Sequence, residues 1–520
     1  MKYDIAIVGS GFGGSLCAMI ARQLGLSVIM LEKDRHPRFV IGESTTPLTD
    51  LYLEELTDKY GLKEVHNLTK YGRWKRSYPD VNVGLKRGFS FFHHEAGKPF
   101  QDGEKHRNQL LVAANPNSEL GDTQWYRPEF DQLLVKIAED YGVEYHDQTE
   151  VKNVRFINND IEMAIEKAGV KKNVNAGFLI DASGPNGFLH HNLDLPGGNK
   201  FPNIPDRESL FTHFKNVGMT MDWINPDEKD NLPYHPDHAA IHLLFDGGWI
   251  WLLRFDNGIV SAGVSLDKKI AREIKLEEGK SAWSRLISRF PSIDDLFKEA
   301  EAVYPFQHMP SMSYRCDKIS GKKWVMLPAA SAFIDPMMST GFPLNLRGIM
   351  RIGKILEHIK EPAKREELLN SYSVETKKDQ QVGARMIAAL LRHLADFELF
   401  SALSMLYFAA ASYSESAIRL KKPELASSFL LDENPEIGPV FRQCYQKALT
   451  INTEKEKKSL IDEIYRSIQS IDVAGLSDTQ RNHWYPVKAK DLLENAGKLN
   501  ATKNEIIDYM KRTGFPVGSD

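Results

Sequence analysis

Apolar and amphipathic segments alternate at the start of the chain. Residues 4–8 form a short apolar run rich in β-branched side chains, which predicts a buried strand. Residues 15–24 place apolar side chains at helical spacing, and a second apolar run follows at 27–31. The order of strand, helix and strand predicts a βαβ unit.

Strand-like and helix-like patterns separate the rest of the chain into regions. Residues 73–118 and 205–315 are rich in strand-like segments, whereas the pattern beyond about residue 360 is mostly helical. The apolar stretch 399–411 contains serines and is shorter than the roughly 20 residues of a membrane span, so it predicts a buried helix. Further elements are expected as helices at 48–60 and 128–141, a meander of strands from 151 that ends in a buried strand at 178–181, hairpins within 240–267, and a strand, loop and helix within 323–358.

The sequence G-S-G-F-G-G lies between the first strand and the first helix, and three of its four glycines fit the pattern G-x-G-x-x-G. Gly9 permits a tight turn, Gly11 lets a pyrophosphate approach the backbone, and Gly14 lets the helix pack close to the strand. Glu32 ends the second strand about 20 residues after Gly11, where a ribose-binding acid is expected. The alternative is a glycine-rich turn in an ordinary βαβ unit; the full order of strand, glycines, helix, strand and acid favours a dinucleotide site.

Charge and cysteine content narrow the class of protein. The 520 residues carry 66 Lys+Arg and 70 Asp+Glu, a net charge of −4, so no nucleic-acid partner is expected. The start of the chain lacks the features of a signal peptide, and no stable membrane insertion is expected. Cys17, Cys316 and Cys444 are far apart and odd in number, which indicates a reducing compartment and predicts a cytoplasmic protein.

The placement of histidines argues against a metal site. His93 and His94 are adjacent, as are His190 and His191. Neighbours on a strand point to opposite faces of the sheet, so neither pair is a good chelate. We therefore predict that the protein binds no metal ion.

Three later segments, "YRPEFDQLL", "LIDASGP" and "AFIDPMMSTG", follow the glycine fingerprint. Together they resemble segments of the FAD-dependent monooxygenase and halogenase superfamily of the para-hydroxybenzoate hydroxylase type. In this resemblance Arg127 lies near the flavin, and Asp181 and Gly184 belong to the second FAD motif. The third segment is similar to the Phe-x-x-Pro-x-x-Ser-x-Gly segment of flavin-dependent halogenases. The resemblance covers roughly residues 1–355, and the remainder matches in length and helical character only.

The resemblance implies an α/β protein with a Rossmann-type FAD-binding fold of the para-hydroxybenzoate hydroxylase class. It also implies a β-rich substrate insert and a helical C-terminal region, with the substrate pocket at a domain interface. The expected segments are FAD-binding at 1–75, 119–195 and 319–358, substrate-binding at 76–118 and 196–318, and helical at 359–520.

Four stretches resemble the tryptophan and phenolic halogenases more closely. "LKRGFSFF" is similar to the Lys-x-Gly-x-x-Phe stretch with the active-site lysine, here Lys86, and "GWIWLL" resembles the Trp-x-Trp-x-Ile-Pro motif with Trp249 and Trp251. "GESTTP" resembles an early flavin loop, and "FIDPMMSTGFPL" a halide and flavin loop that includes Ser339.

The sequence departs from the halogenase pattern at three places. Leu253-Arg254 replaces Ile-Pro, and Leu327-Pro328 replaces Gly-Asp, a change that tryptophan halogenases share. Met338 replaces the second glutamate of Glu-Pro-Leu-Glu-Ser, which assists proton removal in tryptophan halogenases. This methionine argues against free tryptophan as the substrate.

The chemistry implied by the resemblance asks for a particular kind of side chain at position 86. Reduced FAD, O₂ and a halide give hypohalous acid, which has to be held and aimed at an electron-rich ring. A lysine suits this task because burial shifts its pKa readily, so the ammonium can hydrogen-bond the acid or the amine can form a haloamine. The alternative for Lys86 is a solvated hairpin lysine beside Arg87.

The other candidate residues also have two interpretations. Trp249 and Trp251 share one face of a strand, where they either wall off the path from flavin to substrate or fill a core. Thr340 and Gly341 offer backbone N–H groups to a halide or flavin, or they cap a helix that begins near Pro343.

The expected site residues fall into three groups. Lys86 is catalytic, Trp249 and Trp251 act as a gate, and Thr340 and Gly341 bind the halide. FAD binding is assigned to Gly9, Gly11, Phe12, Gly13, Gly14, Glu32, Lys33, Glu43, Ser44, Thr45, Arg127, Val151, Asp181, Gly184, Asp335 and Gly341.

The expected partners follow from the single dinucleotide fingerprint. Without a second fingerprint for NAD(P)H, the resemblance implies that a separate flavin reductase supplies FADH₂. The other partners are a halide and an aromatic small molecule or carrier-bound substrate. Two alternatives stay open: an FAD-dependent monooxygenase or oxidoreductase of the same fold in which Lys86 is incidental, and a non-enzymatic FAD-binding protein whose helical third docks a partner.

Overall fold

A mostly parallel sheet forms the first half of the architecture. The computed structural model describes residues 2–157, 160–185, 187–195 and 200–516. The strand order is β18-β19-β10-β1-β2-β7, and β1 pairs in parallel with both β10 and β2. The sheet is covered on both faces at its centre, where β2 and the second half of β1 are apolar and buried. The strands are β1 (Lys2–Val8), β2 (Val28–Leu31), β7 (Glu144–His146), β10 (Val170–Asp181), β18 (Ser320–Gly321) and β19 (Trp324–Met326), with β8 (Thr149–Ile157) and β9 (Asp160–Lys167) forming an antiparallel extension of β10.

A second, largely antiparallel sheet supplies a broad wall. Its order is β15-β11-β14-β13-β12-β4-β5-β21, with β16 also paired to β11. One face contributes to the main core, and the opposite face packs against α8 and α9 in a second core. The elements are β4 (Gly88–His93), β5 (Gln109–Ala113), β11 (Arg207–Lys215), β12 (Ala240–Phe245), β13 (Gly248–Arg254), β14 (Val260–Asp267), β15 (Glu301–Ala302), β16 (Gln307–Met309), β21 (Trp484–Tyr485), α8 (Lys280–Ile287) and α9 (Pro291–Leu296).

A separate two-stranded sheet consists of β3 (Val83–Lys86) and β6 (Asp122–Trp125), and β3 contacts β13 of the second sheet. Ser44 makes an isolated bridge to Gln124 of β6, so the chain that follows β2 runs alongside this small sheet. Lys86 pairs directly with Asp122 across the two strands. Residues from three distant parts of the sequence therefore meet here.

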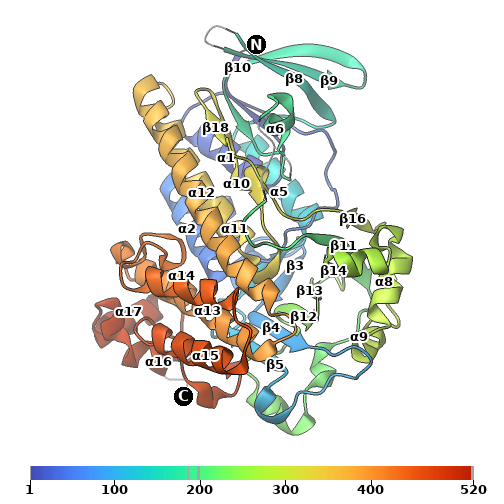
Figure 1. Ribbon diagram of the computed structural model, residues 1–520. Helices are drawn as coiled ribbons and strands as arrows, with labels where there is room; N and C mark the ends of the chain where they lie inside the picture. The colour runs from blue at the N-terminus through green and yellow to red at the C-terminus, as the bar shows by residue number, and fades with distance from the viewer. Residues whose placement is uncertain (1, 158–159, 186, 196–199, 517–520) are drawn as a thin grey trace.

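Helices pack against the first sheet, and the C-terminal helices lie next to β4 and β5 of the second sheet. The helix α1 (Phe12–Gln23) packs against α5 (Arg127–Asp140) and α11 (Gly341–Glu357), and α11 packs in turn against α2 (Pro47–Tyr60) and α12 (Pro362–Arg392). In Figure 1 the C-terminal helices, coloured orange to red, lie beside α2 and next to β4 and β5. These helices are α13 (Phe397–Arg419), α14 (Ile437–Ala448), α15 (Glu454–Ile468), α16 (Ala489–Glu494) and α17 (Lys503–Thr513).

The remaining short elements connect these layers. They are α3 (Lys63–His66), α4 (Tyr71–Ser77), α6 (Phe188–Asn192), α7 (Lys268–Glu273), α10 (Pro328–Ser331), β17 (Tyr314–Arg315) and β20 (Ala332–Phe333). Within the described residues, no helix has both the length and the apolar character that crossing a bilayer requires. The apolar stretch 399–411 lies inside α13, whose side chains there are mostly buried in the main core.

The structure confirms the predicted α/β fold with a Rossmann-type sheet, a β-rich insert and a helical C-terminal region. It adds one feature: the C-terminal region also contributes β21, which pairs with β5 of the second sheet. The six-segment division of the chain stays a prediction. Its boundary at 195/196 adjoins residues 196–199, which lie outside the described residues.

Candidate active site

The glycine loop between β1 and α1 needs glycine for steric reasons. A Cβ on Gly9, where φ is +102°, would lie 2.4 Å from the carbonyl oxygen of Ala182, and one on Gly14 would lie 2.1 Å from the carbonyl oxygen of Gly9. Both distances are far below van der Waals contact with backbone atoms that cannot move aside. The close packing of strand and helix predicted from the sequence is therefore present.

Unlike Gly9 and Gly14, Gly11 lies next to positively charged side chains and not against backbone atoms. It occupies the N-cap of α1, and the atoms nearest to its absent Cβ are guanidinium nitrogens of Arg127, at 3.5 Å, and Arg38, at 3.8 Å. Asp131 holds Arg127 through two hydrogen bonds of 2.8 Å. An uncrowded helix N-terminus flanked by two guanidinium groups suits the pyrophosphate of FAD. Sequence analysis identified Arg127 but missed Arg38.

Glu32 is placed to accept hydrogen bonds from a ribose. Its buried carboxylate accepts from the backbone N–H and the hydroxyl of Ser10, both at 3.0 Å, and lies 3.3 Å from Arg38. Burial opposes ionisation, but the Arg38 guanidinium and the backbone N–H groups of Ser10 and Asp34 hold the pKa of Glu32 below its usual value. The group is therefore a charged acceptor at neutral pH.

The other residues assigned to FAD belong to several elements and differ in burial. Asp181 ends β10, and its carboxylate accepts hydrogen bonds from Ser183 and the backbone N–H of Leu189. Its assigned role stays a prediction, as do those of its neighbours. Phe12 and Gly13 lie buried at the start of α1, Lys33 is exposed after β2, Val151 is buried in β8, Gly184 has a φ of +80°, and Gly341 is exposed at the start of α11.

Lys86 is completely buried at the end of β3. Its Nζ donates to the hydroxyl of Ser44 at 2.9 Å and to the carbonyl oxygen of Thr45 at 2.6 Å. The same nitrogen lies 3.8 Å from the ring centroid of Phe89. The interpretation of this residue as a solvated hairpin lysine is therefore wrong, because the chain after β2 and the ring of Phe89 enclose its amine.

The environment of Lys86 makes its protonation adjustable. Burial lowers the pKa of this lysine from 10.5 to about 7, against the opposing charges of Asp122 and Asp50. Near neutral pH, both the amine and the ammonium are therefore accessible. An arginine at this position would remain charged.

Glu43 fixes the segment that holds Lys86. Its Oε1 lies 2.7 Å from Nε2 of the fully buried His213 on β11, and its carbonyl oxygen accepts from the N–H of Trp125 at 2.7 Å. The carboxylate contacts the second sheet, while the next two residues contact Lys86. Sequence analysis placed Glu43 in a flavin loop and did not identify His213, which no local motif marks.

A row of aromatic rings extends from Lys86 to the tryptophan pair. Phe89 stacks on His242 at 5.8 Å between ring centroids, and His242 stacks on Trp249 at 5.0 Å. Trp249 and Trp251 lie 5.9 Å apart on the face of β13 that contributes to the main core. The two tryptophans share one face of β13, as expected. They line the side of the second sheet that faces the main core. Their gating role stays a prediction.

The loop before α11 is anchored from two directions. Asp335 is buried and accepts from the hydroxyl of Ser265 on β14 at 2.8 Å and from the N–H of Met337 at 3.0 Å. The hydroxyl of Tyr407 on α13 donates to the carbonyl oxygen of Met338, whose φ is +62°. A left-handed φ at a buried, non-glycine residue marks a backbone that the surroundings hold in place.

Thr340 begins α11 without capping it through its side chain. It occupies the N-cap position with helical φ and ψ, and its hydroxyl makes no capping hydrogen bond. The backbone N–H groups at the start of α11 are therefore free of a side-chain cap. The halide role of Thr340 and Gly341 stays a prediction that this geometry permits.

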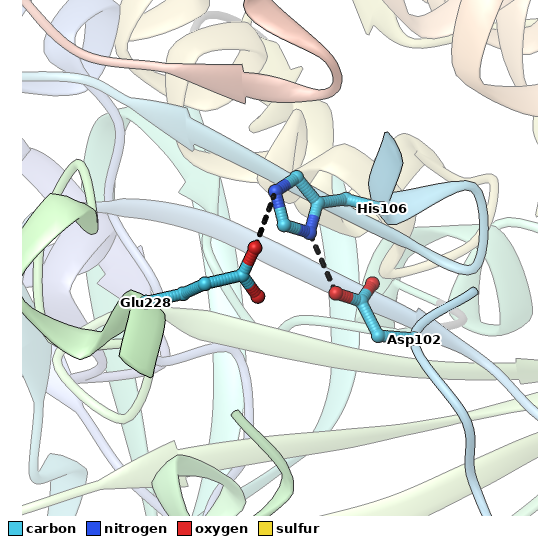
Figure 2. Close-up of side chains that lie close together, drawn as sticks. All are labelled: Asp102, His106 and Glu228. Carbon is cyan, nitrogen blue, oxygen red and sulfur yellow. Dashed lines mark hydrogen bonds and ion pairs between the residues drawn. The ribbon is translucent and has the colours of Figure 1, made fainter. Parts of the chain in front are cut away.

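One cluster of potential metal ligands occurs among the described residues, far from the glycine loop in sequence. Figure 2 shows His106 between two carboxylates, with Nδ1 at 2.6 Å from Asp102 and Nε2 at 3.9 Å from Glu228. The imidazole also stacks on Trp484 of β21 at 4.0 Å between ring centroids. Each ring nitrogen faces a different carboxylate, so the arrangement is that of an imidazole bridging two acids.

Comparison with known proteins gives several strong matches. No family profile matches the chain. A tetracycline 7-halogenase of Kitasatospora aureofaciens is 28% identical over 357 residues, which are 65% of this chain and 60% of that protein. A 1H-pyrrole-2-carbonyl-[peptidyl-carrier protein] brominase of Pseudoalteromonas luteoviolacea is 30% identical over 348 residues, 65% of this chain and 73% of the brominase. The chain thus spans about three fifths of the length of the first relative.

The fold extends further than the sequence likeness. The halogenase PltM, solved with phloroglucinol and FAD, superposes with a TM-score of 0.81 at 21% identity, covering 92% of this chain and 99% of PltM. That coverage exceeds what the first 355 residues alone could supply, so the fold likeness includes much of the C-terminal region. On the strength of its sequence relatives and of the site geometry described above, the chain belongs to the flavin-dependent halogenase family.

Proposed function

We propose that the protein is a two-component, flavin-dependent halogenase that acts on an electron-rich aromatic ring. The observation that carries the proposal is the complete burial of Lys86, with its amine enclosed by Ser44, Thr45 and Phe89. Burying an amine that has only neutral hydrogen-bond partners costs free energy, so the burial of Lys86 supports a functional role for it.

The residues at the glycine loop fit FAD. Gly11, Arg38 and Arg127 would hold the pyrophosphate, and Glu32 would accept hydrogen bonds from the ribose. Bound in reduced form, FAD would supply the chemistry that turns O₂ and halide into hypohalous acid. The protein's part is then to hold this acid near Lys86 and to exclude water from it.

The chain offers the groups for each of these tasks. The backbone at Thr340 and Gly341 would bind the halide. The face of Trp249 and Trp251, continued by His242 and Phe89, would form an apolar wall between flavin and lysine. Lys86 would take up or orient the hypohalous acid and present the halogen to the ring.

The partners follow from the same proposal. A separate flavin reductase would deliver FADH₂, and the organic substrate would be an aromatic compound, either free or bound to a carrier protein. Both kinds occur among the names of the relatives. We place the protein in the cytoplasm because its three cysteines are buried and unpaired.

The test is product analysis with a reductase-driven reaction. The full chain, FAD, NADH, a flavin reductase, O₂ and bromide are incubated with a panel of phenols, indoles and pyrroles. A product with the bromine isotope pattern, formed by the wild type and lost in Lys86→Met, is the expected result. Oxygenated product that forms without halide would instead show a monooxygenase, and tight FAD binding without any product across the panel would contradict the halogenase.

A further inference from the structure

Beside Lys86 lies a buried group of charges to which the proposed function assigns no role. Lys70 Nζ lies 2.8 Å from a carboxylate oxygen of Asp50 and 3.3 Å from one of Asp122. All three side chains are buried. They come from α2, from the residue before α4, and from β6, so the fold brings together three segments that are far apart in sequence. A buried cluster of this kind is costly unless the charges balance one another.

Asp122 links this cluster to the active-site lysine. Lys86 and Asp122 are direct partners in the antiparallel pair of β3 and β6. Directly opposed residues share a face of the sheet, with Cβ atoms roughly 5 Å apart. The Oδ2 atom of Asp122 accepts no hydrogen bond from the described residues. Asp122 thus shares a face of the small sheet with Lys86 and keeps one carboxylate oxygen that accepts no hydrogen bond from the described residues.

Ionisation of Asp50 is unfavourable in this cluster. Burial raises the pKa of Asp50 well above its usual value; Lys70 opposes this rise, and the charge of Asp122 adds to it. Although burial opposes it, Asp50 and Asp122 together raise the pKa of Lys70. Lys70 therefore stays an ammonium, and Asp50 is the carboxyl of the pair that takes up a proton most readily.

We propose that the carboxyl pair of Asp50 and Asp122, anchored by Lys70, exchanges a proton with the nitrogen of Lys86 during halogenation. The inference rests on the proposed function, since it assigns the pair to the same reaction as positioning residues that act through Lys86. Two ammonium groups with two carboxylates carry no net charge, and neither do one ammonium, one amine, one carboxylate and one carboxylic acid. The transfer therefore leaves the net charge of this buried region unchanged, which avoids the cost of an isolated charge.

The exchange begins with the loss of a proton from Lys86. The ammonium N–H bond of Lys86 breaks, its electron pair stays on nitrogen, and the proton joins a carboxylate oxygen of the pair. The amine attacks the halogen of hypohalous acid, so an N–halogen bond forms, the halogen–oxygen bond breaks, and hydroxide leaves with the proton shed by nitrogen as water. The halogen then passes to the aromatic ring, whose displaced proton returns the nitrogen to an amine. The proton held by the carboxyl pair restores the ammonium.

Other groups that face Lys86 are poorly suited to this exchange. Burial and the charge of Lys86 lower the pKa of His242 to about 3, so this imidazole stays neutral. Burial, and the charge of Asp122, raise the pKa of Tyr407 on α13. The hydroxyl of Ser44 and the ring of Phe89 complete the surroundings without a titratable group. The carboxyl pair is thus the acceptor whose protonation can change with that of Lys86.

The test follows the titration of Lys86 directly in the full-length chain. Lysine is labelled with ¹³C at the ε-carbon, the Lys86 signal is assigned by its loss in Lys86→Met, and its shift is followed against pH. Asp122→Asn removes a negative charge and should lower the midpoint by about 1 pH unit. Lys70→Gln removes a positive charge from the pair and should raise the midpoint. The control Asp295→Asn, at an exposed position of α9, should leave it in place.

Activity supplies the second readout. If the free amine reacts, the halogenation rate rises with pH through the Lys86 titration, and the midpoint of this rise moves down in Asp122→Asn and up in Lys70→Gln. Midpoints that stay fixed, or that move in the same direction in both variants, would overturn the inference. If Asp122→Asn does not fold, Asp50→Asn makes the same test, with the same downward shift expected. Absence of halogenated product in the wild type would refute the proposed function, whereas the NMR midpoints would still decide the proton exchange between the cluster and Lys86.

Discussion

The glycine loop and the lysine pocket are built in opposite ways. The loop comes from one continuous stretch, and its requirements are steric: the backbone of Gly9 and Ala182 leaves no room for side chains. The lysine pocket combines β3, β6, β4 and the chain after β2, and its requirements are electrostatic. The glycine loop is therefore sensitive to any added side-chain atom. The lysine pocket is sensitive to substitutions that change the proton affinity of its buried groups.

Substitutions in the glycine loop and in the lysine pocket should therefore have different effects. Damage to the loop should remove FAD and everything that depends on it. Damage to the pocket should leave FAD binding intact and remove only the transfer of halogen.

Lys86→Met should produce the largest change in activity. Methionine fills a similar volume but has no amine, so formation of halogenated product should fall about 1,000-fold, within the range that positioned acid–base and nucleophilic groups contribute. FAD affinity should stay within about twofold of the wild type, because a change smaller than this is under 0.5 kcal/mol. Product analysis measures the halogenation rate, and flavin titration measures the FAD affinity. An equal loss of rate and affinity would show that the glycine loop and the lysine pocket are not separable.

Gly14→Ala should weaken FAD binding about 100-fold, because its Cβ would lie 2.1 Å from the carbonyl oxygen of Gly9 and would push α1 away from β1. Flavin titration by fluorescence measures the effect. The matched control is Gly497→Ala, since a Cβ there meets no atom within 4 Å. Normal FAD affinity in Gly14→Ala would show that the close strand–helix contact is dispensable.

The burial of Lys86 should appear in the pH dependence of stability. Its pKa is lowered from 10.5 to about 7, so between these values the unfolded chain binds a proton that the folded chain does not. The free energy of unfolding should therefore rise by about 2 kcal/mol more in the wild type than in Lys86→Met between pH 7 and pH 9. Urea unfolding of both proteins at the two pH values measures this difference. Parallel pH dependences would mean that the amine is solvated.

Ser44→Ala should have the smallest effect. It removes one of the two hydrogen-bond acceptors of Lys86 but leaves the carbonyl of Thr45 in place, so halogenation should fall only about fivefold, equal to about 1 kcal/mol. FAD affinity should be unchanged. Ser284→Ala, at an exposed position of α8, serves as the control. A loss as large as that of Lys86→Met would place the reacting group on Ser44.

The fold was predictable from local patterns because its main elements depend on local sequence. The glycines, the apolar strands and the helices α1, α2, α5, α11 and α13 follow spacing rules that act over a few residues. The helices α7, α8 and α9 were not predicted, because they lie in the region 205–315 whose pattern indicated strands. The burial of Lys86 was not visible in this way, because a lysine beside Arg87 on a short strand has the pattern of a solvated hairpin. Only the resemblance to halogenases singled it out.

The partners of the site residues escaped prediction for a related reason. Arg38 follows β2 without a motif, His213 lies inside the buried strand β11, and Lys70 precedes a short helix. Each gains its role through contact with a residue at least six positions away and, in most cases, much further. Long-range electrostatic pairing leaves no periodic trace in one sequence, so these residues become visible only when the chain is folded.

The pairing of β21 with β5 has a consequence for how the molecule is made. Synthesis proceeds from the N-terminus, so β5 leaves the ribosome long before Trp484 and Tyr485 do. Until those two residues are synthesised, β5 is an edge strand whose unpaired backbone groups can bind a neighbouring chain. A nascent chain halted after α15 would thus be prone to aggregate even though its nucleotide-binding half is complete.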